Sequence, residues 1–582
     1  MAFLLPALVV LLPLLITPGL LFHYDITPKI VILVLITAAC LALPGETAQG
    51  LAELWRRKTG RWLCLLAAMQ VAWYGVAAAL SSRPLFSLFG SNWRRMGFFT
   101  VVALCAFTVL SAAHLARAPN SLRNVLRAFA IATIVASVYG TLQYFDIDPL
   151  QAASAYHAEA GNSVIVRPPG TLGNADYFGW WLAIALFCAL ALARIETGFR
   201  RVLSLAACVL AGVAIILSGT RSAILAVAAG FLALAFFTRF KPARKHVIAG
   251  LAFAGILAAF YFSPAGTRLK ARVRWSSDEP VGGARPLLWR DSLSMAAAHP
   301  LTGFGPETFA AAFPRYQSVA LARLLPDFYH ESPHNTVLDS LTEQGIPGLI
   351  IALSWAVLGG CAALRARSAA VASGLIASCI ASLFGAVTIG PLFATLLVIA
   401  ILVASDPPDR DAPPIPGRLS VAAVTVPISL SLAAFGLWLA ASDFELAVFQ
   451  RTVSAGLYER MVNTGLPGAA EDLYCARRLG SPAAIPAALR SVFTADNPPN
   501  AWYNLAILLA SQNDAPGVEH ALRSAAALAP NWFKPHWSLA NLLALTGRAD
   551  EAHREAERAV FLDAGKDDEV NDTLKKLTHQ PR

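Results

Sequence analysis

A histidine and an asparagine, His334 and Asn335, stand directly ahead of a long apolar run. Most of the residues that follow are apolar, so a polar pair at this point needs a physical reason. An imidazole titrates near neutral pH and can take the proton of a hydroxyl group, which makes His334 a candidate catalytic residue. Asn335 could orient the imidazole or bind a substrate hydroxyl. The alternative is structural, because asparagine is a good helix cap and His334 could be an ordinary turn residue.

Arginine residues near glycine-containing turns form the second group of candidates. They are Arg94 and Arg95 in SLFGSNWRRMG, Arg167 in VIVRPPGTLGNADYFG, Arg221 in LSGTRSA, and Arg285 and Arg290 in GARPLLWRDS. A guanidinium group is always charged, and its planar fork matches phosphate oxygens in pairs. We therefore expect an anionic head group as ligand, such as a lipid-linked phosphate or diphosphate. Each arginine could instead reach lipid head groups or pair with a loop carboxylate.

Two short patterns could hold a metal ion, but each has a simpler explanation. His330 and His334 have the spacing of a helical metal pair, yet Pro333 argues against a regular helix there. Asp146 and Asp148 form a D-x-D pattern, followed at once by Pro149, which favours a turn. No phosphate-binding Walker loop, zinc-type cysteine spacing or disulfide framework is present. We predict no metal and no cofactor.

The composition indicates an integral membrane protein. The 582 residues are 56% hydrophobic and 14% charged, with a mean hydropathy of +0.56. Soluble domains carry nearer a quarter charged residues. The net charge of +10 is spread over short loops rather than gathered on a basic face, which excludes a nucleic-acid-binding protein.

Apolar runs long enough to cross a bilayer predict thirteen transmembrane helices. They lie near residues 3–22, 29–45, 62–80, 97–115, 123–145, 177–194, 201–218, 222–238, 246–263, 345–364, 370–386, 388–404 and 419–440. The first run lacks a charged leader and a cleavage site, so we expect it to be retained rather than removed as a signal peptide.

Loop charges predict the orientation of these helices. Arginine and lysine collect after every even-numbered span, near residues 56–61, 117–123, 194–201, 239–245 and 365–367. Positive loops remain in the cytoplasm, so we expect a cytoplasmic N-terminus. Only the loop at 405–418 departs from the pattern. The long insert at 264–334 and everything after the last span then lie on the outer, periplasmic side.

The last 140 or so residues change character and contain an internal repeat. AWYNLAILLASQ, from Ala501, aligns with PHWSLANLLALT, from Pro535, at a period of 34 residues. That period is typical of tetratricopeptide repeats, which stack helix pairs into a concave binding surface. The domains predicted are a transmembrane unit at 1–440 and an α-helical, tetratricopeptide-like tail at 443–582. A plain helical domain without a ligand is the alternative.

Four ordered motifs resemble the O-antigen ligase and polymerase superfamily of bacterial membrane glycosyltransferases. They are the R-x-P-G-T-x-G-N segment from Arg167 to Asn174, the SGTRSA hairpin around Arg221, the HPLTGFGPETF turn at 299–309, and PHNTVLDSLTEQGIPG at 333–348. The resemblance covers about residues 80–405.

The resemblance implies an all-α membrane glycosyltransferase of the GT-C type, located in the bacterial inner membrane. Its donor would be a glycan on undecaprenyl diphosphate, transferred on the periplasmic face without a metal. His334 takes the position of the family's essential histidine, and Arg221 and Arg167 take positions of arginines that hold the diphosphate. The predicted catalytic residues are His334 and Arg221. The predicted substrate-binding residues are Arg167, Arg94, Arg95, Asn174, Arg290 and Asn335.

The acceptor and two other functions stay open at this point. The acceptor could be lipid A core, a growing glycan or a protein hydroxyl, and the repeat-containing tail favours a protein acceptor or protein partner. A transporter of lipid-linked glycans would carry polar residues along its spans, whereas here they crowd the outer edge. A membrane-tethered repeat scaffold would leave the outer arginines unexplained.

Overall fold

The computed structural model describes residues 1–160, 163–239, 244–278, 283–365, 368–409, 411, 421–480 and 482–579. The described chain is almost entirely helical, which confirms the all-α prediction. Parts of the loops used for orientation, at 240–243 and 366–367 and most of 405–418, lie outside the described residues.

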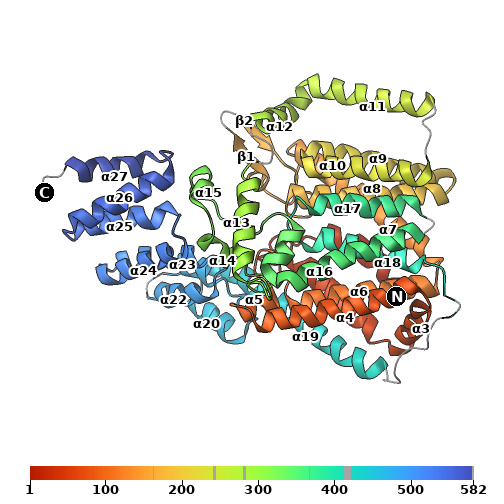
Figure 1. Ribbon diagram of the computed structural model, residues 1–582, viewed down its shortest axis with the longest axis horizontal. Helices are drawn as coiled ribbons and strands as arrows, with labels where there is room; N and C mark the ends of the chain where they lie inside the picture. Colours follow the sequence, from red (N-terminus) through yellow and green to blue (C-terminus); the bar gives the residue numbers. More distant parts are fainter. Residues whose placement is uncertain are drawn as a thin grey trace.

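A bundle of mostly apolar helices of different lengths makes up the larger part of the molecule (Figure 1). Their bounds are α1 (Leu4–Leu14), α2 (Thr27–Leu41), α3 (Pro44–Trp55), α4 (Lys58–Ala79), α6 (Phe98–Arg117), α7 (Ser121–Tyr144), α8 (Ala175–Ile195), α9 (Gly198–Ser218), α10 (Arg221–Thr238), α11 (Arg244–Phe262), α16 (Thr336–Arg365), α17 (Ala369–Ser382), α18 (Ile389–Ala404) and α19 (Val421–Thr452).

The number of membrane spans is smaller than the sequence predicted. Every predicted span falls on a helix, but only eight described helices are long and apolar enough to cross a membrane alone. Two sharply bent pairs, α2 with α3 and α11 with the following segment, raise the number to ten. Helices α1, α17 and α18 are apolar but shorter. The chain is a multi-pass membrane protein, and thirteen separate spans are not confirmed.

Helix α8 is the centre of the bundle. It packs against α7, α9, α10, α17 and α18, and apolar residues occupy nearly all of its faces. A helix that is apolar all round can be buried on every side. Trp181 and Phe187 are among its fully buried side chains. The bundle thereby fixes the start of α8, where the segment that carries Arg167 ends.

Short elements form the loops at one end of the bundle. They are α5 (Pro84–Phe89), the antiparallel hairpin of β1 (His157–Ala160) and β2 (Ser163–Val166), α12 (Thr267–Asp278), α13 (Arg285–Ala298), α14 (Phe309–Ala312) and α15 (Val319–Leu324). In Figure 1, α13 to α15 stand between the bundle and the tail. The loop region at 264–334 is thus largely helical.

Helix α16 is broken near its start. Gly345 has φ +67° and ψ −167°, outside the helical region, and Pro347 follows it. The turn at 299–305 fits into the break with main-chain bonds from Phe304 N–H to Thr342 O and from Gly305 N–H to Glu343 O, both 3.0 Å long. A Cβ atom on Gly303 would lie 2.4 Å from the Glu343 main chain, so only glycine allows this approach.

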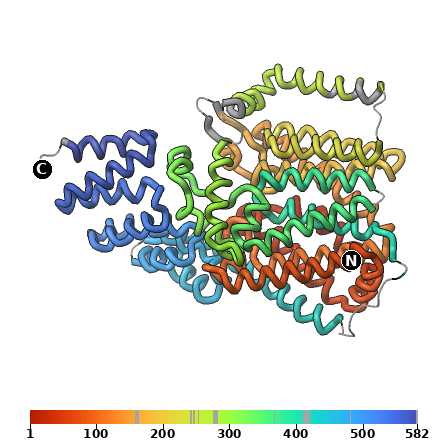
Figure 2. The backbone as a smooth tube through the Cα atoms, viewed as in Figure 1, coloured from red at the N-terminus to blue at the C-terminus, as the bar shows by residue number. Residues whose placement is uncertain are grey.

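The tail is a series of paired helices, coloured blue in Figures 1 and 2. They are α20 (Ala455–Thr464), α21 (Asp472–Arg478), α22 (Ala484–Thr494), α23 (Pro498–Ala510), α24 (Ala515–Leu528), α25 (Phe533–Leu545), α26 (Ala549–Asp563) and α27 (Asp568–His579). Helices α23 with α24 and α25 with α26 pack as consecutive pairs. This layout agrees with a helical-pair repeat, whereas the tetratricopeptide assignment and the domain bounds stay predictions.

The tail is joined to the bundle through a continuous helix and a partly buried histidine. Helix α19 runs without interruption to Thr452, so the predicted boundary near residue 443 falls inside a helix. His23, in the loop between α1 and α2, lies 2.7 Å from the Asp443 carboxylate and 3.1 Å from that of Glu471. Burial would lower the pKa of His23, but these two hydrogen bonds raise it to about 9.

Candidate functional site around His334

Two arginines meet at the first turn of α8. Asn174 caps this helix, because its Oδ1 accepts a 2.8 Å hydrogen bond from the N–H of Asp176. The Asp176 carboxylate in turn accepts from Arg167 Nη2 at 2.8 Å, and Arg285 Nη2 lies 3.9 Å from its other oxygen. Segments more than a hundred residues apart therefore bring two guanidinium groups to one carboxylate.

His334 is held near this pair by a strained loop. Its φ is +50°, in the left-handed region that non-glycine residues seldom adopt. Its N–H donates to Ser332 Oγ at 3.1 Å, and the preceding carbonyl of Pro333 accepts from Trp289 Nε1 at 3.0 Å. Trp289 lies on α13 one helical turn after Arg285, so the same helix positions an arginine and the histidine loop.

The charges around His334 favour its neutral form. Burial lowers the pKa of His334 from its ordinary value of 6.5. The field of Asp176 opposes this effect, the field of Arg285 adds to it, and smaller contributions come from Asp339 and Arg167. The net shift is downward, so the imidazole is free to accept a proton at neutral pH.

Arg221 belongs to a hairpin that docks on the same turn of α8. It is the first residue of α10 and follows Gly219, whose φ is +63°. Thr220 Oγ1 donates to the carbonyl of Ala175 at 3.0 Å, which fixes the hairpin to the start of α8. Arg272 packs over Gly219 so closely that a Cβ there would lie 2.8 Å from Arg272 Cγ.

Asn335 is a helix cap in this structure. Its Oδ1 accepts hydrogen bonds from the N–H groups of Val337 and Leu338, at 3.0 and 3.2 Å. Asn174 also caps a helix, so both asparagines that were predicted to bind substrate lie at the start of a helix. Their contact with a substrate stays a prediction, and the contacts described here are structural.

Arg94 has three carboxylate partners and is 3% exposed. Its guanidinium bonds Glu307 at 2.5 Å, Asp339 at 2.9 Å and Glu343 at 2.6 Å. Burial opposes its charge, but the carboxylates, led by Asp339, raise the pKa of Arg94 well above its usual range. The cluster joins the segment before α6, the turn before α14 and the first part of α16.

The other two predicted arginines have partners outside the group around Asp176. Arg95 is 1% exposed, and its closest carboxylate contact is Asp443, at 3.9 Å. Arg290 is largely exposed and bonds Asp291 and, at 2.7 Å, Ser318 Oγ. The structure brings together Arg167, Arg285 and His334, with the Arg221 hairpin on the same turn of α8. Arg94, Arg95 and Arg290 are bound elsewhere, and their substrate-binding roles stay predictions.

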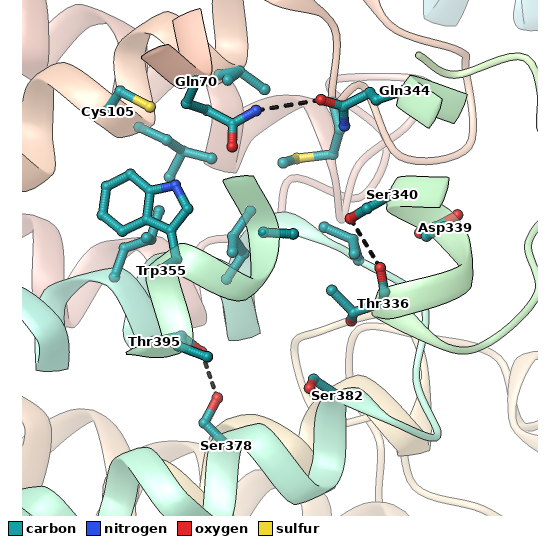
Figure 3. Close-up of a pocket in the computed structure, with 18 of the residues that line it drawn as sticks. Gln70, Cys105, Thr336, Asp339, Ser340, Gln344, Trp355, Ser378, Ser382 and Thr395 are labelled. Carbon is teal, nitrogen blue, oxygen red and sulfur yellow. Dashed lines mark hydrogen bonds between the residues drawn. The ribbon is translucent and has the colours of Figure 1, made fainter. Parts of the chain in front are cut away.

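Two cavities reach the region of the candidate site. One, of about 220 Å³, lies among α4, α6, α8, α16, α17 and α18 (Figure 3). Its lining is mostly apolar, with polar contacts such as Gln70 to Gln344 and Ser378 to Thr395. The other, of about 280 Å³, is lined by Asn174, Tyr177 and Glu331 and adjoins the first at Arg94. The first cavity is suited to an apolar chain, and the second, with its polar lining, is suited to a polar head group.

The aspartates of the D-x-D pattern are engaged in local contacts. Asp148 accepts hydrogen bonds from Tyr139 and Gln143 and from the N–H groups of the turn after it. Asp146 pairs with His157 and Arg268. In the part of the chain that the structure describes, no three metal-ligating side chains lie together.

Sequence reasoning gave two residues of this site too little weight. Arg285 was one of several candidate arginines but was left out of the predicted substrate-binding residues, and Asp176 had no assigned role. The first turn after the Asn174 cap could have drawn attention to Asp176, since a carboxylate there is favoured by the helix N-terminus. The pairing of Asp176 with Arg285 has no local signal, because it arises through space.

A comparison with protein families finds one match. Residues 206–353 match the family model described as O-Antigen ligase. No curated protein matches the chain. The matched segment is about a quarter of the chain and includes Arg221, Arg285 and His334, whereas Arg167 and Asp176 lie before it. This multi-pass membrane protein thus contains a segment similar to the O-antigen ligase family, and that segment supplies His334, Arg285 and Arg221.

Proposed function

We propose that the protein transfers a glycan from a polyprenyl-diphosphate carrier to an acceptor hydroxyl at the outer face of a bacterial inner membrane. The observation that carries this proposal is the meeting of Arg167, Arg285 and His334 at the start of α8. The family match supports the reaction class, namely glycan transfer of the O-antigen ligase or polymerase type.

Each group has a chemical task in such a transfer. The acceptor oxygen attacks the anomeric carbon, the bond from that carbon to the diphosphate oxygen breaks, and the diphosphate leaves with the electron pair. Its growing charge is stabilised by the guanidinium groups of Arg167, Arg285 and Arg221 and by the N-terminus of α8. The neutral imidazole of His334 takes the acceptor proton. No metal ion has a step in this scheme.

Asp176 acts as a counter-ion in the absence of donor. Its carboxylate accepts a hydrogen bond from Arg167 and faces Arg285 at 3.9 Å, while Arg285 Nη2 donates to the carbonyl of Phe384 at 3.1 Å. A diphosphate carries more negative charge and would compete for the same donors. The arginines are therefore already oriented when the donor arrives, which reduces the free-energy cost of reorganisation.

The orientation of the chain follows from the same proposal. The N-terminus would face the cytoplasm and the tail the periplasm, as the charged loops predict. In Figure 1 the N-terminus and the tail lie toward opposite ends of the bundle, which supports this arrangement. The donor is a polyprenyl diphosphate such as the undecaprenyl form, and the tail is a tetratricopeptide-like unit. A second candidate, transfer to a protein hydroxyl, is favoured by the position of the tail beside the loop that leads to His334.

The test is glycan transfer in membranes from cells that make a labelled polyprenyl-diphosphate glycan. His334→Ala and Arg221→Ala should each abolish transfer at normal protein levels. His553→Ala and Arg523→Ala, which alter exposed tail residues, serve as matched controls and should transfer as the unaltered protein does. Unchanged transfer in both site variants would reject the site. The electrophoretic shift of the product identifies the acceptor class.

A further inference from the structure

The polar cavity of about 280 Å³ lies beside the group around Asp176. Its lining comes from the segments that lead into α2, α6, α8, α16 and α18. Asn174 and Tyr177, which line it, stand on either side of Asp176 at the start of α8. Glu331 lines it three residues before His334, and a chain of that length spans at most about 11 Å. The cavity is therefore next to the proposed reaction centre.

Two carboxylates in this lining have no protein partner. Among the described residues, no hydrogen-bond donor or cation lies within bonding distance of the side chains of Asp25 and Glu331. Asp25 lies directly against Gly173, where a Cβ atom would overlap with its Oδ2. Glu331 is an exposed side chain. Both carboxylates are therefore free to accept hydrogen bonds from a bound molecule.

Three donors in the same lining also have no protein partner. The amide oxygen of Asn174 accepts from the N–H of Asp176, so its NH₂ group faces the other way. That NH₂ group, the hydroxyl of Tyr177 and the indole N–H of Trp93 bond to no side chain or main-chain group in the described ranges. None of the three is enclosed by protein, so each can reach a ligand in the cavity.

The cations of the lining are already engaged. Arg94 bonds its three carboxylates, and Lys29, which is 1% exposed, donates to the main-chain carbonyls of Leu15, at 3.1 Å, and Asp25. A phosphate or an acidic sugar would meet two free carboxylates without a free cation from this lining, and like charges repel. A neutral ligand that both donates and accepts hydrogen bonds fits the groups that remain.

We propose that this cavity binds the first sugar of the donor glycan and selects a neutral sugar, with Asp25 and Glu331 as acceptors of its hydroxyl groups. A sugar ring carries several hydroxyl groups, each of which can donate and accept. Its donors match the two carboxylates, and its oxygens match the amide, hydroxyl and indole donors. Hydrogen bonds to charged groups contribute more than neutral ones, so the carboxylates dominate the selection.

The position of the cavity assigns it to the donor, and this step rests on the proposed function. In a polyprenyl-diphosphate glycan the first sugar is bonded directly to the diphosphate. The diphosphate is proposed to lie on Arg167 and Arg285, which meet at Asp176. Because Asn174 and Tyr177 belong to the same part of α8, the sugar next to the diphosphate would lie in this cavity. Asp25 and Glu331 would then determine which sugar is accepted.

Binding is measured with the full-length protein in detergent micelles. The probes are undecaprenyl diphosphate alone and the same carrier with glucose, glucuronate, galactose or galacturonate attached. Within each pair of sugars the only difference is a carboxylate in place of a hydroxymethyl group. The variants are Glu331→Gln, Asp25→Asn and Tyr177→Phe, and Glu557→Gln, at an exposed position of the tail, is the matched control. Thermal unfolding of each variant shows that the fold is retained.

The unaltered protein should bind at least one neutral-sugar probe about tenfold more tightly than the carrier alone and about tenfold more tightly than its acidic counterpart. The preference for the neutral sugar should shrink in Glu331→Gln and Asp25→Asn. The gain over the carrier alone should shrink in Tyr177→Phe, and both ratios should be unchanged in Glu557→Gln.

Three results would overturn the inference: neutral-sugar probes that bind no more tightly than the carrier alone, acidic probes that bind as tightly as neutral ones, or ratios that no cavity variant changes. Tight binding of the carrier alone, without any effect of the sugar, would reject the cavity and leave the proposed function standing. Weak binding of every probe, the carrier alone included, would reject both.

Discussion

Arg94 offers the sharpest test of whether an arginine of this protein is structural or binds substrate. Its guanidinium bonds three carboxylates, from Glu307, Asp339 and Glu343, and all four side chains are almost fully buried. Arg94→Met would leave the three carboxylates together without a counter-ion. Removal of one partner of a buried ion pair costs about 3–5 kcal/mol. The loss is not three times larger, because the carboxylates can take up protons when the cation is gone.

The assay compares equilibrium unfolding of the purified variants in detergent with glycan transfer in membranes. Arg290→Met is the matched control, since Arg290 is 57% exposed and its pairing with Asp291 is worth at most about 1 kcal/mol. Neutralisation of Glu307, Asp339 and Glu343 to the matching amides should recover much of the stability lost in Arg94→Met. If Arg94→Met unfolds like Arg290→Met yet fails in transfer, the structural explanation is refuted and Arg94 binds substrate.

Three further predictions concern charge. The initial rate of transfer by the unaltered protein should be constant above pH 6.5 and should fall as the pH drops through the lowered pKa of His334. Initial rates that do not fall at acidic pH would contradict this prediction. Arg285→Lys should lower transfer by about tenfold or more, because an ammonium group lacks the two-pronged fork, while Arg523→Lys in the exposed part of the tail should change it little. His23 has a folded pKa of about 9, above its ordinary 6.5, so its contribution of about 3 kcal/mol is fully present below pH 6.5 and is lost as the pH rises through 9. The free energy of unfolding of the unaltered protein should therefore exceed that of His23→Gln below pH 6.5, and the gap between the two should close as the pH rises through 9. A gap that does not change with pH would contradict this prediction.

The broad architecture could be predicted from hydropathy, and part of the site could be predicted from motifs. The apolar span predicted from residue 345 begins at the Gly345 break, because the change in composition and the change in backbone coincide there. His334, Arg167 and Arg221 were singled out because each stands beside an interruption of the apolar pattern and within a motif that resembles the ligase and polymerase superfamily, and their roles stay predictions. Short helices such as α17 were counted as spans because composition alone does not reveal how long a helix remains regular.

The remaining features depend on contacts between distant segments. Glu307 and Glu343 are far from Arg94 in the sequence, so their contact with it could not be predicted. The charge of Arg94 therefore suggested an anionic ligand, whereas in the structure its partners are carboxylates of the protein itself. Arg285 and Asp176 are a similar case.

The break in α16 has a consequence for the response of the protein to its lipid surroundings. The regular part from Ile346 to Arg365 is about 30 Å long, close to the thickness of the hydrocarbon layer. The nine residues before Gly345 are held instead by the main chain of the turn at 299–305. Hydrophobic mismatch in a thicker or thinner bilayer is relieved by tilting of the spanning part. The same turn also binds the first residue of the spanning part, because Ile346 N–H donates to the carbonyl of Pro300 at 2.8 Å. A change in tilt is therefore expected to reach the turn at 299–305 and the first part of α16, so the candidate site should respond to the thickness of the membrane.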